Sequence, residues 1–254
     1  MKRPLLLQLL FVALLVVCIV PQAQASAFMR INVDGTIVTC DNSAALCGAG
    51  FTTAVGGDSI QFTGTVNGVN FGGGGVVGIQ LTGNSPGTPA IAFILDTKSS
   101  LTNTSAALHT ITIDTGLNNF TTPSGPGFLH ASQTANWTVS TAGESQAFTV
   151  WLRNTNDFIV PGGNGVASTA ACVSPGGLAQ SCDALTANIP INAAGPYALT
   201  AREVITLAPG SIASFTATNA LTATPINVPE PGSLVLLGTG MLMVVGNQLR
   251  KRWK

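Results

Sequence analysis

Among the residues able to do chemistry, the cysteines show the most informative spacing. Five are present, and four of them form two local pairs in the body of the chain, Cys40 with Cys47 and Cys172 with Cys182. In an oxidising compartment, an even number of cysteines favours disulfides. Four cysteines allow three pairings, and closure of the shortest loops favours Cys40–Cys47 and Cys172–Cys182.

The same cysteines are poorly spaced for a metal. Zinc sites usually combine closely spaced cysteines of the Cys-x-x-Cys kind with histidines. The two histidines, His109 and His130, neighbour none of the cysteines. We therefore expect disulfides and no bound metal at these positions.

A candidate nucleophile lies at Ser59. The tetrapeptide Gly57-Asp58-Ser59-Ile60 resembles the Gly-Asp-Ser-Leu block of a hydrolase family whose serine is the nucleophile. The resemblance implies a later Asp-x-x-His, which supplies the base and its orienting carboxylate. Neither His109 nor His130 has an aspartate three residues before it. A secreted hydrolase is therefore the least favoured function, and the chain is expected not to be an enzyme.

The carboxylates do not group in the sequence as a hydrolytic or metal site requires. A glycosidase needs two carboxylates about 5–10 Å apart, and the acidic residues of the body are scattered singly. Polar loop residues of the kind that bind calcium through oxygen atoms occur in two groups: Asp114, Asn118 and Asn119, and Asn154, Asn156 and Asp157. Such residues commonly form turns instead. No cofactor is predicted, and calcium remains the alternative.

Two tryptophans, Trp137 and Trp151, lie on expected strands beside threonines and Arg153. An exposed indole on a β-sheet offers a flat apolar face on which a sugar ring can stack. Burial at a sheet edge is the competing structural interpretation. These two residues are the candidate glycan-binding positions.

The amino-acid composition excludes two classes of protein, disordered chains and nucleic-acid-binding proteins. Hydrophobic residues make up 46% and charged residues 8% of the 254 residues. Disordered chains are more charged and less hydrophobic, and nucleic-acid binding needs a dense basic surface. The segment from Ala27 to Val228 holds four basic and nine acidic residues, so nucleic acid is not an expected partner.

The segment between the two termini has the sequence pattern of β-strands and not of helices. Apolar and polar residues alternate in Ser59–Val66, Leu108–Ile113 and Ala147–Arg153, as they do in half-buried strands. Ala208-Pro209-Gly210 reads as a hairpin turn between two further strands. We expect an all-β fold, a single β-sandwich with Greek-key or jelly-roll connections, over residues 28–219.

The N-terminus has the three parts of a secretory signal peptide. Lys2 and Arg3 precede an apolar stretch, which ends at small residues suited to a signal peptidase. Cleavage is expected after Ala25 or Ala27, and residues 1–25 are assigned to the signal peptide.

The C-terminus reads as a membrane-associated tail. An extended stalk is expected over residues 220–231, and an apolar helix over residues 232–254. Gly232 to Leu249 as a helix would span roughly 27 Å, just under the hydrocarbon core of a bilayer. The tail ends in a basic cluster that would stop transfer and stay on the cytoplasmic side, namely Arg250, Lys251, Arg252 and Lys254.

The residues Val228, Pro229, Glu230 and Pro231, followed by the apolar stretch and the basic cluster, resemble the PEP-CTERM sorting signal of Gram-negative bacteria. The resemblance covers Val228 to Lys254. It implies recognition by an exosortase in the inner membrane and processing near the Pro-Glu-Pro sequence. It also implies a setting of extracellular polysaccharide and biofilm. The polar pair Asn247-Gln248 departs from the pattern by shortening the apolar helix.

The sequence therefore predicts an exported protein that passes the inner membrane and is sorted to the cell surface or extracellular matrix. A structural or adhesive role in exopolysaccharide or biofilm is the leading hypothesis. A carbohydrate-binding module on the cell surface is the alternative.

Overall fold

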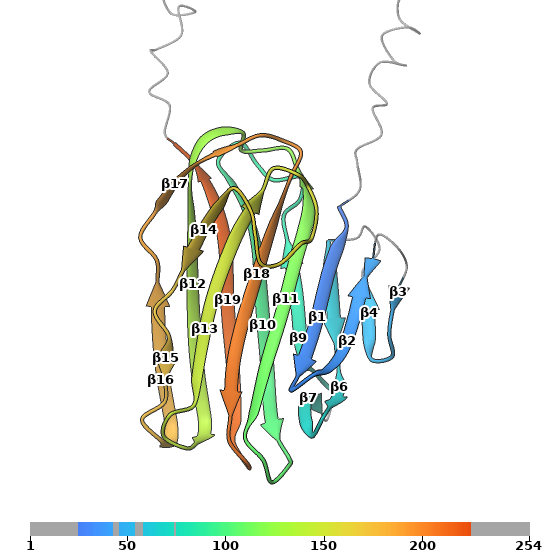
Figure 1. Cartoon of the computed structure of the whole chain (residues 1–254), viewed down its shortest axis with the longest axis vertical. Coiled ribbons are helices and arrows are strands. Elements are labelled where there is room, and N and C mark those ends of the chain that lie inside the picture. The colour runs from blue at the N-terminus through green and yellow to red at the C-terminus, as the bar shows by residue number, and fades with distance from the viewer. Residues whose placement is uncertain (1–24, 43–45, 54–57, 74, 225–254) are drawn as a thin grey trace, which may run out of the picture. The chain divides into compact units, whose positions relative to one another are not determined.

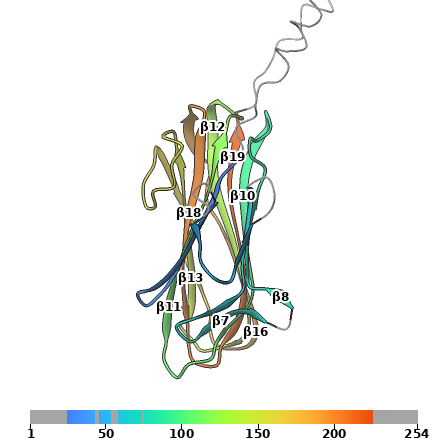
Figure 2. The ribbon, with the colours of Figure 1, turned by 90° about the vertical axis from the view of Figure 1, so that its right-hand side faces the viewer.

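The computed structural model describes residues 25–42, 46–53, 58–73 and 75–224. These residues form two antiparallel sheets that lie face to face as a β-sandwich (Figures 1 and 2). The predicted fold class, all-β with a single sandwich, is confirmed. Most of the predicted signal peptide and most of the C-terminal tail lie outside the described residues.

The first sheet has eight strands, with the order β14-β13-β18-β11-β1-β2-β3 and β15 paired to β13. Its strands are β1 (Ala27–Val33), β2 (Thr36–Asp41), β3 (Leu46–Cys47), β11 (His109–Phe120), β13 (Ser145–Arg153), β14 (Gly165–Ser168), β15 (Cys172–Val173) and β18 (Tyr197–Leu207).

The second sheet has eleven strands, and β16-β12-β19-β10-β9-β5-β4 is its main path. Its strands are β4 (Phe51–Thr53), β5 (Ser59–Phe62), β6 (Gly64–Val66), β7 (Val69–Gly73), β8 (Val76–Val77), β9 (Ile79–Gly83), β10 (Ile91–Asn103), β12 (Gly125–Ser140), β16 (Gly177–Leu185), β17 (Ile189–Ala193) and β19 (Ile212–Ala223). The small strands β6, β7 and β8 pair beside the end of β10.

Side chains that point inward from the two sheets make one hydrophobic core. In β1, every second residue from Ala27 to Val33 is buried and the residues between them are partly exposed. The same alternation runs along most of β10 and β12. Because successive side chains of a strand point to opposite faces, the period-two pattern of the sequence decides which residues enter the core.

Two details of the sequence-based organisation are wrong. Ala208-Pro209-Gly210 does not close a hairpin, because β18 pairs with β11 and β13 while β19 pairs with β10 and β12. The chain crosses there from one sheet to the other. Residues 220–223, which belong to the predicted stalk, pair with β10 and β12 as part of β19.

Candidate functional site

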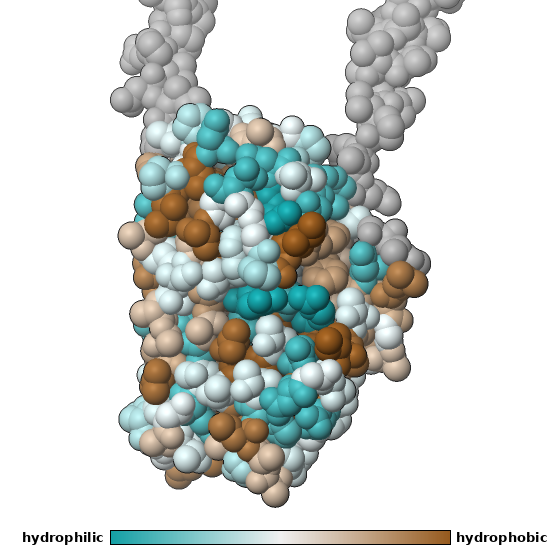
Figure 3. All heavy atoms as spheres, viewed as in Figure 1, coloured by the Kyte–Doolittle hydropathy of each residue, from teal (hydrophilic) through white to brown (hydrophobic). Residues whose placement is uncertain are grey.

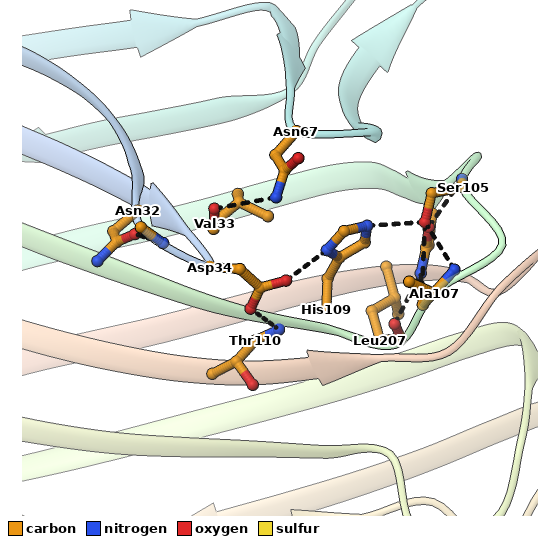
Figure 4. A network of polar contacts seen from close by, with 11 residues as sticks. Asn32, Val33, Asp34, Asn67, Ser105, Ala107, His109, Thr110 and Leu207 are labelled. Atoms are coloured by element: carbon orange, nitrogen blue, oxygen red, sulfur yellow. Dashed lines mark hydrogen bonds and ion pairs between the residues drawn. The ribbon is translucent and has the colours of Figure 1, made fainter.

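A line of three polar side chains, Asp34, His109 and Ser105, forms the candidate site (Figure 4). His109 Nδ1 lies 2.6 Å from Asp34 Oδ2, and His109 Nε2 lies 2.7 Å from Ser105 Oγ. Asp34 comes from the β1–β2 turn, Ser105 from the β10–β11 loop, and His109 begins β11. A carboxylate, an imidazole and a hydroxyl joined in this order are the groups that activate a serine nucleophile.

Asp34 owes its position to a tight hairpin turn. Asp34 and Gly35 have φ values of 48° and 94°, and Val33 pairs with Thr36, so the loop has two residues. Asp-Gly is a preferred pair for such a turn, whose central residues both need positive φ. Since β1 also pairs with β11, the turn lies beside the start of β11. There Asp34 Oδ1 accepts a hydrogen bond from the backbone N–H of Thr110, at 3.0 Å.

Ser105 is fixed by polar contacts inside its own loop. The buried Asn103 accepts a hydrogen bond from the Ser105 backbone N–H at 2.9 Å, and its Oδ1 lies 2.8 Å from Ser105 Oγ. The backbone N–H of Ala107 donates to Ser105 Oγ at 3.1 Å. These contacts place the hydroxyl against His109, but they also give its single hydrogen other acceptors within reach.

A third turn closes over the same site. Asn67 and Gly68 connect β6 to β7 with φ values of 44° and 78°, and Asn67 Nδ2 donates to the Val33 carbonyl oxygen at 3.3 Å. A Cβ atom added to Gly68 would lie 2.8 Å from Ser105 Cβ and 3.5 Å from His109 Nε2. Glycine is therefore needed for this close approach as well as for the backbone conformation.

The electrostatics favour an ionised Asp34. The hydrogen bond with His109, followed by the one from the Thr110 backbone, holds the pKa of the Asp34 carboxyl below its usual value of 3.8. An ionised carboxylate can only accept hydrogen bonds, so His109 Nδ1 donates to Asp34. In the neutral imidazole, Nε2 is then free to accept the Ser105 hydroxyl hydrogen. The His109 side chain is 6% exposed and that of Asp34 is 38% exposed.

The array supplies a nucleophile, a base and an orienting carboxylate, the groups needed to activate a serine. Acyl transfer also requires donors for the oxyanion and a place for the substrate. A described surface pocket lies at the end of β2 that is far from Asp34, and so it does not adjoin the Ser105 hydroxyl. Its lining residues are Phe28, Thr39, Asp41, Leu46, Cys47 and Gly48.

The predicted nucleophile Ser59 does not join this site. It is the first residue of β5 and pairs with Thr82 of β9, and no contact to a histidine is present among the described residues. Asp34 and Ser105 were not singled out by any sequence motif. The turn dipeptide Asp34-Gly35 is the one local signal that points toward this place.

Of the two interpretations of Trp137 and Trp151, the structure favours burial. Trp137 is 1% exposed, and its ring meets that of Phe215 edge-on, with 6.0 Å between centroids. Trp151 is 9% exposed. Both strands turn these side chains away from solvent, so neither indole offers an open face to a sugar ring.

The residues proposed for calcium have protein partners instead. The carboxylate of Asp114 accepts hydrogen bonds from Arg30 and Arg202. Asn156 Nδ2 donates to Asn119 Oδ1 at 2.8 Å, which joins one candidate group to the other. In the part of the chain that the structure describes, no three histidine, cysteine or acidic side chains gather as metal ligands would.

Both predicted disulfides are present. Cys40–Cys47 joins β2 to β3 within the first sheet. Cys172–Cys182 joins β15 of the first sheet to β16 of the second, with 5.6 Å between Cα atoms. The second disulfide therefore ties the two layers of the sandwich together.

The predicted sorting residues 228–231, the transmembrane helix and the basic cluster lie outside the described residues, as does most of the signal peptide. Within the described ranges, the structure has no helix of sufficient length and apolarity to span a membrane.

The described fold has a partial similarity to several solved structures. One is TmCBM61 in complex with β-1,4-galactotriose, with 11% identity, TM-score 0.32, and coverage of 57% of this chain and 88% of that chain. Another is a structure of carbohydrate-binding modules from the β-sandwich superfamily, with 12% identity, TM-score 0.29, and coverage of 76% and 83%. A third is a family 12 xyloglucanase from Bacillus licheniformis, with 12% identity, TM-score 0.23, and coverage of 68% and 95%. Similarity this low says nothing of what the present chain binds.

The C-terminal segment gives the informative match. No curated protein is similar in sequence to this chain, but residues 227–251 match the family model of the PEP-CTERM protein-sorting motif. The match confirms the resemblance seen at Val228 to Lys254. The chain is thus an exported protein that carries a PEP-CTERM signal for exosortase-dependent sorting to the cell surface.

Proposed function

We propose that this protein is a non-enzymatic structural or adhesive component of the cell surface or extracellular matrix. The observation that carries the proposal is the pairing of every lysine and arginine in the described residues with a carboxylate of the same domain. The pairs are Arg30 and Arg202 with Asp114, Lys98 with Asp96 and Glu203, and Arg153 with Asp157.

This pairing leaves a surface without free cations on the described β-sandwich. Figure 3 shows one face, on which hydrophobic residues are scattered among hydrophilic ones. Polyanions such as nucleic acids need unpaired basic side chains. Hydroxyl and amide groups can instead exchange hydrogen bonds with the hydroxyls of an uncharged polysaccharide. We therefore favour a neutral, hydroxyl-rich matrix as the partner.

The proposal is tested in cells that lack the gene, by measuring the cohesion of flocs or biofilm under shear. Cohesion should fall on deletion and return with the full chain. A chain without residues 227–251 should be made but should not restore cohesion, because it lacks the sorting motif. Unchanged cohesion in the deletion strain would contradict a structural role.

Processing of the tail is a separate part of the proposal. C-terminal peptide mass spectrometry should find a mature chain that ends near Pro229-Glu230-Pro231 in material from the cell surface or medium. An intact Lys254 in the inner-membrane fraction would instead indicate a protein that stays anchored there, and would remove the main support for a matrix location.

A dedicated carbohydrate-binding site would have to lie away from Trp137 and Trp151, which are buried. Retardation of the mature protein in affinity gels that contain an uncharged polysaccharide would support such a site. Equal mobility with and without polysaccharide would oppose it.

A second candidate function is acyl hydrolysis at Ser105. The specific observation in its favour is the unbroken line from Asp34 through His109 to Ser105 Oγ. It predicts that a fluorophosphonate probe labels the wild-type protein and fails to label Ser105→Ala, with Ser59→Ala as the matched control that keeps its labelling. A folded wild-type protein that takes up no probe would exclude this function. Restoration of cohesion by Ser105→Ala would show that the surface role needs no such activity.

A further inference from the structure

The core of the sandwich holds three ionisable side chains whose reactivity neither proposed function requires. Lys98 and Asp96 lie on β10, and Glu203 lies on β18. Their side chains are at most 3% exposed. Lys98 Nζ lies 2.8 Å from Asp96 Oδ2 and forms an ion pair with Glu203 Oε2.

The strand pattern explains how these residues come together. Asp96 and Lys98 occupy the inward positions of β10, in phase with the buried Ile94. Glu203 occupies an inward position of β18, between the buried Ala201 and Ile205. Because β10 and β18 belong to opposite sheets, the contact between Lys98 and Glu203 crosses the interior of the sandwich.

The charges of the cluster do not balance if all three groups are ionised. One ammonium then faces two carboxylates in an interior with little water. Burial raises the pKa of the Asp96 carboxyl and that of the Glu203 carboxyl, which favours protonation of one of them. Burial favours the neutral amine of Lys98, but the two acidic neighbours outweigh this effect and raise its pKa. Movement of a single proton from Lys98 to the remaining carboxylate gives three neutral groups.

Hydrogen bonding within the cluster is incomplete. Asp96 Oδ1 is buried and has no hydrogen-bond partner in the described structure, whereas Lys98 Nζ contacts one oxygen of each carboxylate. By contrast, Gln146 Nε2 donates to Glu203 Oε1 at 2.7 Å. Buried charges without full hydrogen bonding are strongly unfavourable, so a reaction that replaces them with a neutral group would relieve this cost.

We propose that Lys98 Nζ and Glu203 Cδ become joined by an amide bond in the folded protein. The neutral amine of Lys98 attacks the carboxylic acid carbon of Glu203, the N–C bond forms, and the C–O bond to the departing hydroxyl breaks. The amine loses one hydrogen, which passes through Asp96 to the departing hydroxyl, so that the hydroxyl leaves as water. One water molecule is released, and no oxidant or other reactant is required.

The surroundings supply what this condensation needs. The hydrogen bond from Gln146 polarises the Glu203 carbonyl, in the manner of an oxyanion-stabilising donor. Asp96 lies within reach of Nζ and can take its proton and return one to the leaving hydroxyl. The two reacting groups are held together in a site that excludes water, which favours condensation over hydrolysis.

Glu203 is the acyl partner that the geometry favours over Asp96. Asp96 is two residues from Lys98 on the same strand, and in the described structure no residue other than Lys98 places a donor at either of its oxygens. Glu203 has its second oxygen fixed by Gln146. A bond to Glu203 would tie the two sheets covalently, at a second place besides Cys172–Cys182, and would resist reducing agents.

The test is the intact mass of the mature wild-type protein after reduction of its disulfides. The chain should be lighter, by one water molecule, than the sequence between its measured ends. Trypsin should leave the peptide bond after Lys98 uncut, and tandem mass spectrometry should find Lys98 linked to the peptide that begins with Glu203. Full mass with a linear Lys98 peptide would overturn the proposal, and a link from Lys98 to Asp96 would overturn the assigned partner.

Two variants distinguish the role of a reacting group, Lys98, from that of the proton carrier, Asp96. Lys98→Met cannot form the bond and should show no mass deficit. Asp96→Asn keeps both reacting groups and, once folding is verified by circular dichroism, should show at least a tenfold slower loss of water. Condensation at the wild-type rate in Asp96→Asn would refute the role of Asp96. The mass measurement tests the Lys98–Glu203 bond, and the cohesion assay tests the surface role. Either proposal can therefore be refuted without affecting the other.

Discussion

Asp114 on β11 and Arg202 on β18 lie directly opposite each other and are joined by two hydrogen bonds. Arg202 Nε donates to Oδ1 at 2.6 Å, and Nη2 donates to Oδ2 at 3.0 Å. Arg30, the partner of Asp114 on the other neighbouring strand β1, donates to the same carboxylate. One buried carboxylate thus binds two arginines across three adjacent strands.

Asp114→Asn should destabilise the fold by about 2 kcal/mol, because hydrogen bonds to charged groups contribute roughly this much. The variant leaves two arginines facing a neutral amide. Chemical unfolding measures the change in the free energy of unfolding. Asp183→Asn is the matched control, since Asp183 is exposed and its Oδ1 accepts a hydrogen bond from the Thr134 hydroxyl. An equal effect of the two substitutions would contradict the importance of the Asp114 cluster.

Protonation of Asp157 in acid should lower the stability of the fold. The hydrogen bond from Arg153, aided by Thr155 and the Ile159 backbone, lowers the pKa of Asp157 from 3.8 to about 2. A carboxyl whose pKa is lower in the folded state contributes stability above the unfolded value, and this is lost as pH falls through the folded value. Its contribution should therefore disappear between pH 3.8 and about 2.

The measurement for Asp157 is an NMR titration of its carboxyl carbon. Arg153→Met should move the pKa of Asp157 back toward 3.8, the ordinary value. A midpoint that stays near 2 in this variant would mean that Arg153 is not the cause.

Gly68→Ala should destabilise the protein more than a matched glycine substitution elsewhere. A Cβ at Gly68 would lie 2.8 Å from Ser105 Cβ, whereas a Cβ at Gly143 would have nothing within 4 Å. Both glycines have positive φ, 78° and 93°, so the strain of the left-handed backbone, about 1 kcal/mol, is common to them. Overpacking should add about 1–3 kcal/mol at Gly68. Thermal unfolding of the two variants gives the comparison, and equal losses would argue against a close contact at Ser105.

Removal of the disulfide between the sheets should lower stability by about 2–3 kcal/mol in the chain-entropy account. The test is thermal unfolding of the double variant Cys172→Ala, Cys182→Ala. The double variant Cys40→Ala, Cys47→Ala serves as comparison, because that disulfide lies within one sheet. If the bond between the sheets matters for their association, hydrogen exchange in β16 should rise in the first variant and not in the second.

Much of the local structure follows from the sequence. The alternation in Ala147–Arg153 predicts the strand that the structure contains as part of β13. The spacing of the cysteines predicts both disulfides, since each loop is short enough for local closure. The hairpin turns at Asp34-Gly35 and Asn67-Gly68 were not predicted, although residue type accounts for them, because these pairs accept positive φ.

The candidate site could not be predicted in the same way. Asp34 and His109 are 75 residues apart, and their contact exists because β1 pairs with β11. Trp137 could not be assigned to the core from its strand pattern, since period two separates the faces of a strand but does not say which face is buried. Which face of a strand is buried depends on where the opposing sheet packs.

The sequence by itself determined the destination of this protein, its β-rich body and its local disulfides, because each of these depends on residues that are close together in the chain. The tertiary structure decided which strands are neighbours and which of them face each other across the core. That choice brings Ser105 to His109 and Lys98 to Glu203. Both contacts join different elements of the fold, and the second crosses the interior, where burial makes the protonation and reactivity of ionisable groups depend on their neighbours.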